Sequence, residues 1–158
     1  MFLWRISNHP NLDGRGGLVA SARWHTEGRP VVYLAETPAG ALVEALVHLE
    51  LTPGHLPKSY RLLKAEAPDS LSSATVTAAD LTGTDWIHDQ IATRTIGDKW
   101  LASASSTTLR VPSAIVPETF NVLLNPEHPD AARVQILWDA EYPWDERLLR
   151  VNAQSESP

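Results

Sequence analysis

The stretch Val31-Val32-Tyr33-Leu34-Ala35-Glu36-Thr37-Pro38 joins two elements that decide the fold. Its first five residues are β-branched, aromatic or aliphatic, which favours a strand. Thr37 is a good helix N-cap, and proline suits the first helical position. The sequence therefore predicts a strand over residues 31–35 that leads directly into a helix from Pro38 to about Glu50.

The helix predicted over residues 38–50 is amphipathic. Apolar residues recur at helical spacing and predict its buried face: Ala41, Leu42, Ala45, Leu46 and Leu49. Glu44 and His48 lie one turn apart on an adjacent stripe of the same helix. Thr52-Pro53-Gly54 is expected to end it.

The other predicted elements are mostly strands. A first strand covers residues 2–7 and a loop dense in turn formers covers residues 8–17. Further strands are predicted over residues 59–65, 75–77, 108–111, 121–124 and 134–138, and a helical region over residues 85–93, with Gly97 as an interruption. Strands neither alternate regularly with helices nor form an all-β series, which predicts a single α+β domain with a twisted mixed sheet flanked by helices. The domain is expected over residues 1–150, with a polar tail over 151–158.

Composition limits the class of protein. The chain has 158 residues, of which 43% are hydrophobic and 20% charged, so it can bury one substantial core. It has no cysteine, which excludes disulfides, thiol nucleophiles and cysteine-based metal sites. No apolar run is long enough for a membrane helix or a signal peptide, so a cytoplasmic protein is expected. The net charge of -6 argues against direct nucleic-acid binding.

Standard nucleotide and metal motifs are incomplete. The stretch Gly14-Arg15-Gly16 contains G-x-G but lacks the third glycine and a following helix, so its glycines are interpreted as turn residues. Glu44 and His48 supply at most two of the three or four ligands that a zinc ion needs. No metal is expected.

Six blocks in order resemble a known family. They are Leu3-Trp4-Arg5-Ile6, Ser21-Ala22-Arg23-Trp24, Gly28-Arg29-Pro30-Val31-Val32-Tyr33-Leu34-Ala35, Ala41-Leu42-Val43-Glu44, Leu109-Arg110-Val111-Pro112-Ser113-Ala114 and Asn121-Val122-Leu123-Leu124-Asn125-Pro126. The set resembles the RES-domain toxins of bacterial toxin–antitoxin pairs. The resemblance extends from residue 3 to about residue 148.

This resemblance implies a toxin that consumes NAD+ as its substrate, on a fold similar to the ADP-ribosyltransferase core. It also implies a partner, a cognate antitoxin with an Xre-like helix-turn-helix domain. A homodimer within that complex is left open. Cleavage of the nicotinamide–ribose bond develops positive charge on the ribose, so the site must hold the pyrophosphate and stabilise a cation.

Arginine and glutamate fit those two requirements. Arg5 and Arg23 are assigned to the pyrophosphate, because a guanidinium offers a permanently charged fork of donors. Glu44 is assigned to a ribose hydroxyl and to electrostatic stabilisation of the cation. The ordinary alternatives are a surface ion pair for each arginine and a solvated helix position for the glutamate.

Two further residues are assigned to the ligand with less defined roles. Tyr33 can stack on nicotinamide or donate a hydrogen bond to the ribose, and its alternative is a core tyrosine. Ser113 is read as a hydrogen-bonding residue because no His/Asp pair lies nearby in sequence, and its alternative is a turn or cap.

Three polar residues in the last third of the chain are interpreted as structural. They are Asn121, Asn125 and His128. The family often has asparagine after the Arg-Trp pair, and this chain has His25, so any contact of that amide must be lost, replaced or mediated by water.

Several functions remain open on the sequence. ADP-ribose can pass to water, to phosphate or to a protein acceptor, because loops around the site choose the acceptor. A module without catalysis is a second reading: the acidic half of the chain, residues 65–158, would dock a partner or the site would sense a nucleotide. An RNA-cleaving toxin is a weaker one, since no histidine pair for phosphodiester cleavage is evident.

Overall fold

The computed structural model describes residues 1–49 and 59–149. Its strands are β1 (Phe2–Ser7), β2 (Val32–Ala35), β3 (Arg61–Glu66), β4 (Ser73–Thr75), β5 (Thr108–Pro112), β6 (Phe120–Leu124) and β7 (Gln135–Glu141). Its α-helices are α1 (Gly16–Val19), α2 (Pro38–His48) and α3 (Ile91–Ser103), with 3-10 turns at Ala78–Leu81, Ala131–Arg133 and Glu146–Leu149. The predicted end of the helix at Glu50, the Thr52-Pro53-Gly54 stop and the polar tail lie outside the described residues.

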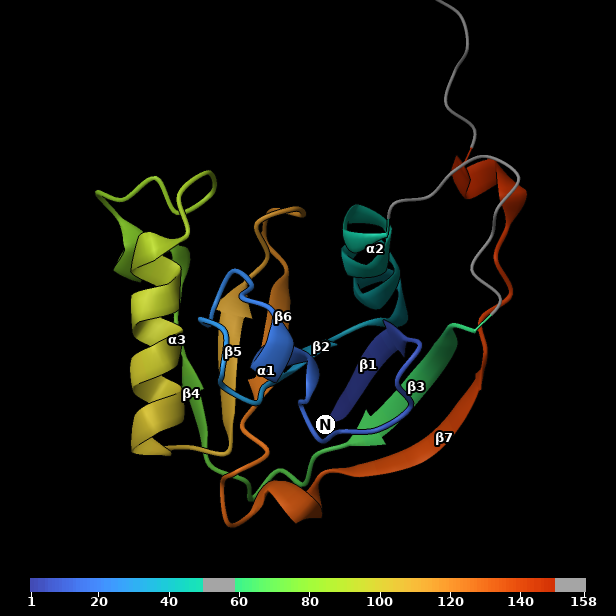
Figure 1. The fold of residues 1–158 in the computed structure, drawn as a ribbon, viewed down its shortest axis with the longest axis horizontal. Helices are drawn as coiled ribbons and strands as arrows, with labels where there is room; N and C mark the ends of the chain where they lie inside the picture. Colours follow the sequence, from blue (N-terminus) through green and yellow to red (C-terminus); the bar gives the residue numbers. More distant parts are fainter. Residues whose placement is uncertain (50–58, 150–158) are drawn as a thin grey trace, which may run out of the picture.

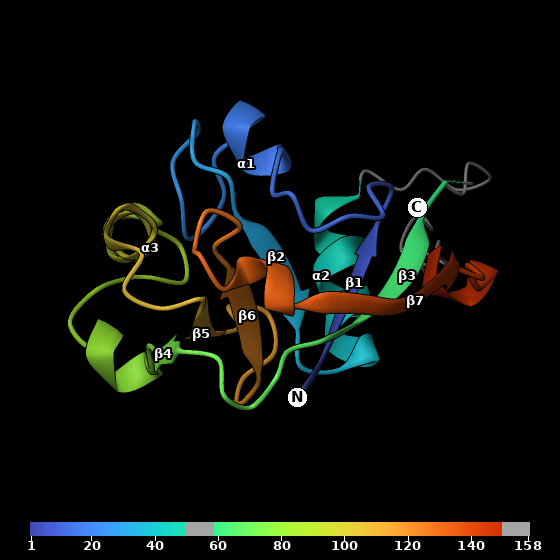
Figure 2. The ribbon, with the colours of Figure 1, turned by 90° about the horizontal axis from the view of Figure 1, so that it is seen from below.

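One seven-stranded sheet organises the molecule, in the order β4-β5-β6-β2-β1-β3-β7 (Figure 1). Neighbouring strands are antiparallel except β4 and β5, which are parallel. Helix α3 lies at the β4 and β5 end, and β7 forms the opposite edge (Figures 1 and 2). The expected α+β domain with a mixed sheet flanked by helices is confirmed.

The sheet opens between β1 and β2. These strands share a single pair of facing residues, Trp4 and Ala35, whereas β1 and β3 pair along their whole length. Side chains of both diverging strands line the same cavity, described below. The separation therefore creates space for a ligand in the middle of the sheet.

The passage from β2 to α2 forms as the sequence predicts. The Thr37 hydroxyl accepts a hydrogen bond from the Gly40 N–H at 3.0 Å, and Pro38 occupies the start of the helix. Ala41 and Ala45 are buried in a cluster with Ile6 of β1. This packing fixes the face of α2 that is turned toward the opening in the sheet.

Two local predictions are wrong. The region over residues 85–93 is mostly a turn, and the helix starts at Ile91 and continues through Gly97 to Ser103. Gly97 lies within the helix and does not interrupt it. The absence of a side chain there lets α3 approach the backbone of Trp24. Residues 16–19, partly assigned to a loop, form the single turn α1 after Gly14, whose φ of 70° is a turn conformation that glycine favours.

The close approach at Gly97 gives a stability prediction. A Cβ at this position would overlap the carbonyl group of Trp24, so Gly97→Ala must push α3 away from a buried contact. We expect a loss of about 3 kcal/mol in the free energy of unfolding, the upper end for overpacking. Urea unfolding measures it as a lower midpoint. Gly16→Ala is the control, because nothing lies within 4 Å of its added Cβ, and a similar loss there would contradict the explanation.

In the part of the chain that the structure describes, none of the helices combines the length and apolarity needed to cross a bilayer.

Candidate active site

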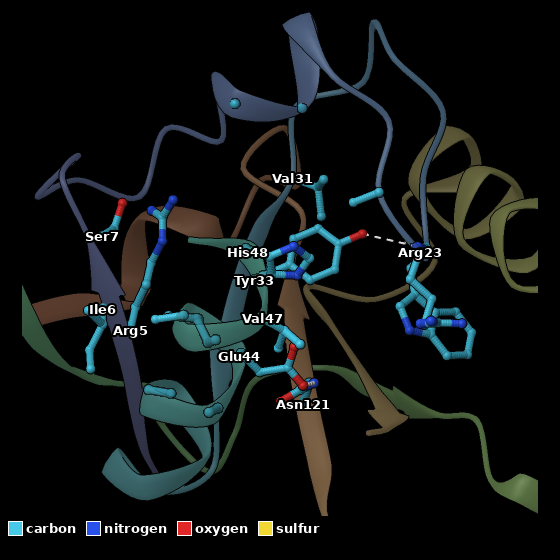
Figure 3. Close-up of a pocket in the computed structure, with 18 of the residues that line it drawn as sticks. Arg5, Ile6, Ser7, Arg23, Val31, Tyr33, Glu44, Val47, His48 and Asn121 are labelled. Atoms are coloured by element: carbon cyan, nitrogen blue, oxygen red, sulfur yellow. Dashed lines mark hydrogen bonds between the residues drawn. The ribbon is translucent and has the colours of Figure 1, made fainter. Parts of the chain in front are cut away.

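A cavity of about 770 Å³ lies where β1 and β2 separate. Its walls come from β1, the segment from α1 to His25, β2, α2, the end of β5, the start of β6 and the start of α3. Figure 3 shows Arg5 and Arg23 on opposite sides, with Tyr33, Glu44 and His48 between them. The volume falls in the usual range of small-molecule sites, about 300–1,000 Å³.

The structure brings the five residues singled out in the sequence to one place. Arg5, Arg23, Tyr33 and Glu44 line the cavity. Ser113 does not line the cavity, although its chain neighbours Pro112 and Ala114 do. Its hydroxyl donates a hydrogen bond to Glu44. Segments 108 positions apart in the chain, from Arg5 to Ser113, thus converge on one site.

Glu44 is held through one of its two carboxylate oxygens. Its Oε1 accepts hydrogen bonds from Asn121 Nδ2 at 2.6 Å and from Ser113 Oγ at 3.2 Å. Its Oε2 has no hydrogen-bond partner among the described residues. The carboxylate is therefore oriented by the protein and keeps one oxygen available for a ligand.

Asn121 was missed as a site residue. The sequence favoured a structural role for it, yet it lines the cavity beside Glu44. No signal in the sequence links the two, because the contact depends on the β2–β6 register that places Asn121 opposite Ala35. The structural interpretation of the other two residues agrees with the structure: Asn125 accepts from the Glu127 N–H, and His128 contacts Thr107 and Asp130.

Ser113 connects Glu44 to the β5–β6 turn. Its hydroxyl oxygen accepts from the backbone N–H groups of Ile115 and Val116, each at 3.2 Å, while its hydrogen is donated to Glu44. All hydrogen-bonding capacity of the hydroxyl is used by the protein. Ser113 is placed to orient the carboxylate, with no arrangement that would make it a nucleophile.

Three arginines line the cavity without a carboxylate partner. Among the described residues, six arginines form ion pairs: Arg15, Arg29, Arg61, Arg110, Arg133 and Arg147. Arg5, Arg23 and Arg94 form none with any described carboxylate, and these three are the ones at the cavity. Unpaired guanidinium groups gathered around a cavity are the arrangement expected for an anion-binding site.

The three cavity arginines are held by neutral oxygens instead. Arg5 donates to the Asn11 carbonyl at 3.0 Å, and burial lowers the pKa of its guanidinium, with Asp13 acting in the opposite direction. Arg23 donates to the Trp86 carbonyl at 2.6 Å. Arg94 donates to the Ala22 carbonyl at 2.9 Å. Each side chain is fixed without being neutralised.

Arg94 was also missed by the sequence analysis. The predicted helix ended at residue 93, whereas the real α3 places Arg94 in its first turn and beside the Ala22–Arg23 segment. Gly97, one turn later, permits this closeness. Only the correct helix boundaries would have pointed to the residue.

Two contacts hold the hydroxyl of Tyr33. Its oxygen accepts from the Trp24 N–H at 3.1 Å and lies 2.9 Å from Nδ1 of His25. Burial raises the pKa of the phenol well above its usual value of 10.0. His25 is itself 3% exposed, and its Nε2 lies 2.9 Å from the Ala20 carbonyl oxygen.

The buried imidazole makes stability depend on pH. Burial is the main cause that lowers the pKa of His25 below 6.5, with nearby Arg94 acting in the same direction and the Ala20 carbonyl and Asp98 opposing. The unfolded chain then binds more protons than the folded one at mildly acidic pH, so this contribution is complete above pH 6.5 and is lost as the pH falls through the folded pKa.

We therefore expect the free energy of unfolding to fall more steeply below pH 6.5 in the unmodified chain than in His25→Asn. Urea denaturation of both proteins across the acidic range measures the difference. A parallel pH dependence in the two proteins would show that His25 does not titrate on unfolding.

Metal ligands are not clustered at this site. Over residues 1–49 and 59–149, no group of three or more histidine, aspartate or glutamate side chains is placed to hold a metal ion. His48 is exposed at the end of α2 and lines the cavity one turn after Glu44. The arrangement offers cationic donors, one carboxylate and an aromatic ring, which suits an anionic ligand that also carries a hydroxylated and a planar group.

The chain is similar to curated toxins. A curated relative from Pseudomonas putida (strain KT2440), named Toxin Res, is 48% identical over 138 residues, covering 86% of this chain and 93% of its own. A relative from Sphingobium sp. (strain YBL2), named Prs ADP-ribosylating toxin, is 34% identical over 156 residues, covering 93% of this chain and 96% of its own.

A solved structure shares the fold. A chain in the crystal structure of the M. tuberculosis MbcT–MbcA toxin–antitoxin complex superposes with a TM-score of 0.69 at 19% identity, covering 89% of this chain and 83% of that chain. The family model described as RES domain matches residues 2–145. With nearly the whole described fold inside that match, the chain belongs to the RES domain family.

Proposed function

We propose that this protein is the toxin of a toxin–antitoxin pair and that it cleaves the nicotinamide–ribose bond of NAD+. The names of its relatives and the complex that contains its structural neighbour support the first part. The partner would be an antitoxin of the Xre-like helix-turn-helix type. A second copy of the chain within that complex also belongs to the proposal.

The observation that carries the second part is the set of three unpaired arginines in one cavity with one oriented carboxylate. A dinucleotide brings a diphosphate, which matches the guanidinium forks of Arg5, Arg23 and Arg94. It also brings two riboses, whose hydroxyls can donate to the available oxygen of Glu44.

The reaction follows from the charges. When the bond to nicotinamide breaks, the electron pair leaves with the nicotinamide nitrogen, and positive charge develops on the ribose. Glu44 stabilises that charge through a carboxylate already fixed by Asn121 and Ser113, so it need not reorganise during the step. The arginines hold the ligand from the diphosphate side and keep the reacting bond at the carboxylate.

A protein acceptor is the second candidate function. The relative named Prs ADP-ribosylating toxin favours it, because it covers 93% of this chain. In this case the same bond breaks, and ADP-ribose is transferred to a macromolecule instead of water or phosphate.

The test is to incubate the folded protein, freed of its antitoxin, with NAD+ and to measure nicotinamide release by chromatography. Release of nicotinamide with free ADP-ribose supports hydrolysis. Release of nicotinamide with phosphorylated ADP-ribose, seen only when phosphate is present, supports phosphorolysis. Label from the adenine part that stays on an added protein supports transfer. No release by protein with an intact fold overturns the proposed reaction.

A further inference from the structure

The hydrogen atoms around Tyr33 can be assigned from their partners. A carbonyl oxygen only accepts, so the 2.9 Å contact with Ala20 requires the proton of neutral His25 on Nε2. Nδ1 is then an acceptor, and among the described residues the Tyr33 hydroxyl at 2.9 Å is the group that donates to it. The Trp24 N–H donates to the same hydroxyl oxygen.

The Tyr33 hydroxyl therefore has no hydrogen to give a ligand. Its single proton is committed to His25, and one of its lone pairs is used by Trp24. Figure 3 shows the hydroxyl directed at the backbone next to Arg23, away from Glu44. Apart from one remaining lone pair on this hydroxyl oxygen, what Tyr33 offers to the cavity that it lines is the surface of its ring.

We infer that His25 is a positioning residue that fixes the Tyr33 hydroxyl so that the ring face, not the hydroxyl, contacts the planar cationic group of the substrate. The inference rests on the proposed function, in which that group is the nicotinamide ring of NAD+. A tyrosine face attracts a positively charged ring more strongly than a neutral one. The site should thus prefer the oxidised dinucleotide to its reduced form, whose nicotinamide is uncharged.

This role predicts a division between binding and chemistry. The positive charge of the nicotinamide ring is lost as the bond breaks, so its attraction to Tyr33 stabilises bound substrate more than the transition state. Losing this attraction should raise KM without lowering kcat. Tyr33→Phe keeps the ring and should change KM by less than about threefold. Tyr33→Leu removes the ring and should raise KM for NAD+ by about tenfold, while its weaker inhibition by NADH should change little.

Two substitutions of His25 separate its two contacts. An asparagine amide can occupy the place of Nδ1 and accept from Tyr33, whereas a glutamine amide extends to the place of Nε2 and can donate to Ala20. We expect His25→Asn to keep KM within about threefold and His25→Gln to raise it by about tenfold, with kcat lowered in neither. In a Tyr33→Phe background, His25→Gln should have no further effect on KM, because its partner hydroxyl is already absent.

The experiment combines nicotinamide release with NAD+ binding by calorimetry and with nitrogen NMR of the histidine tautomer. An Nε2–H tautomer at His25, with the KM pattern above, supports the inference; an Nδ1–H tautomer, equal effects of the asparagine and glutamine variants, or a tenfold loss of kcat in Tyr33→Phe overturns it. If His25→Gln does not fold, the tautomer and Tyr33→Phe still decide. If no protein releases nicotinamide, the proposed reaction fails, while the tautomer and the binding constants still test the role of His25.

Discussion

Replacing Glu44 with glutamine is expected to lower kcat for nicotinamide release by about 10²–10³-fold, the usual cost of removing one preorganised electrostatic contact to a transition state. The glutamine Oε1 can still accept from Asn121 and Ser113, which both contact a single oxygen of the present carboxylate. The geometry of the cavity is therefore retained and only the negative charge is lost. KM should change by less than about threefold, because the charge acts on the ribose cation that forms in the reaction.

Glu66→Gln is the matched control for this experiment. Glu66 is exposed at the end of β3 and does not line the cavity, so the same loss of charge there should leave kcat unchanged. Expression in cells gives a second readout, since Glu44→Gln should relieve growth arrest and Glu66→Gln should not. Equal kcat in Glu44→Gln and the unmodified chain would remove Glu44 from the chemistry.

The elements that the sequence predicts well are those specified by local chemistry. The β2–α2 unit forms at its predicted position because Thr37 caps the helix and Pro38 starts it. The first strand has the predicted limits, Phe2–Ser7. The helix α3 was misplaced because Gly97 is a packing residue, and its reason, the backbone of Trp24, lies 73 positions earlier in the chain.

The site residues also fall into those that the sequence indicates and those that depend on packing between distant segments. Arg5, Arg23, Tyr33 and Glu44 could be singled out because they stand in blocks that resemble a family. Arg94 and Asn121 could not, since one depends on the packing of α3 and the other on strand register. His25 departs from the asparagine that the resemblance suggests, and the structure gives it a contact with Tyr33 in place of the amide.

The unpaired arginines give the second large effect. Arg5→Ala is expected to raise KM for NAD+ by about 10²-fold, because a charge-assisted hydrogen bond contributes about 1.5–3 kcal/mol and a guanidinium can make two to a diphosphate. Arg5→Lys keeps the charge without the planar fork and should raise KM by about tenfold. Steady-state nicotinamide release over a range of NAD+ concentrations gives both values.

Stability distinguishes this role from a structural one. In the described structure Arg5 donates to a neutral oxygen, the Asn11 carbonyl, and burial outweighs the attraction of Asp13 and lowers the pKa of its guanidinium, so the charge is a cost to the empty protein. Removing it should change the free energy of unfolding by no more than about 1 kcal/mol. Arg15→Ala is the control: its side chain is 83% exposed and paired with Asp13, and KM should not respond. If Arg5→Ala instead unfolds the protein, the guanidinium supports the fold. If the variant folds and leaves KM as it was, the diphosphate must be bound by Arg23 and Arg94.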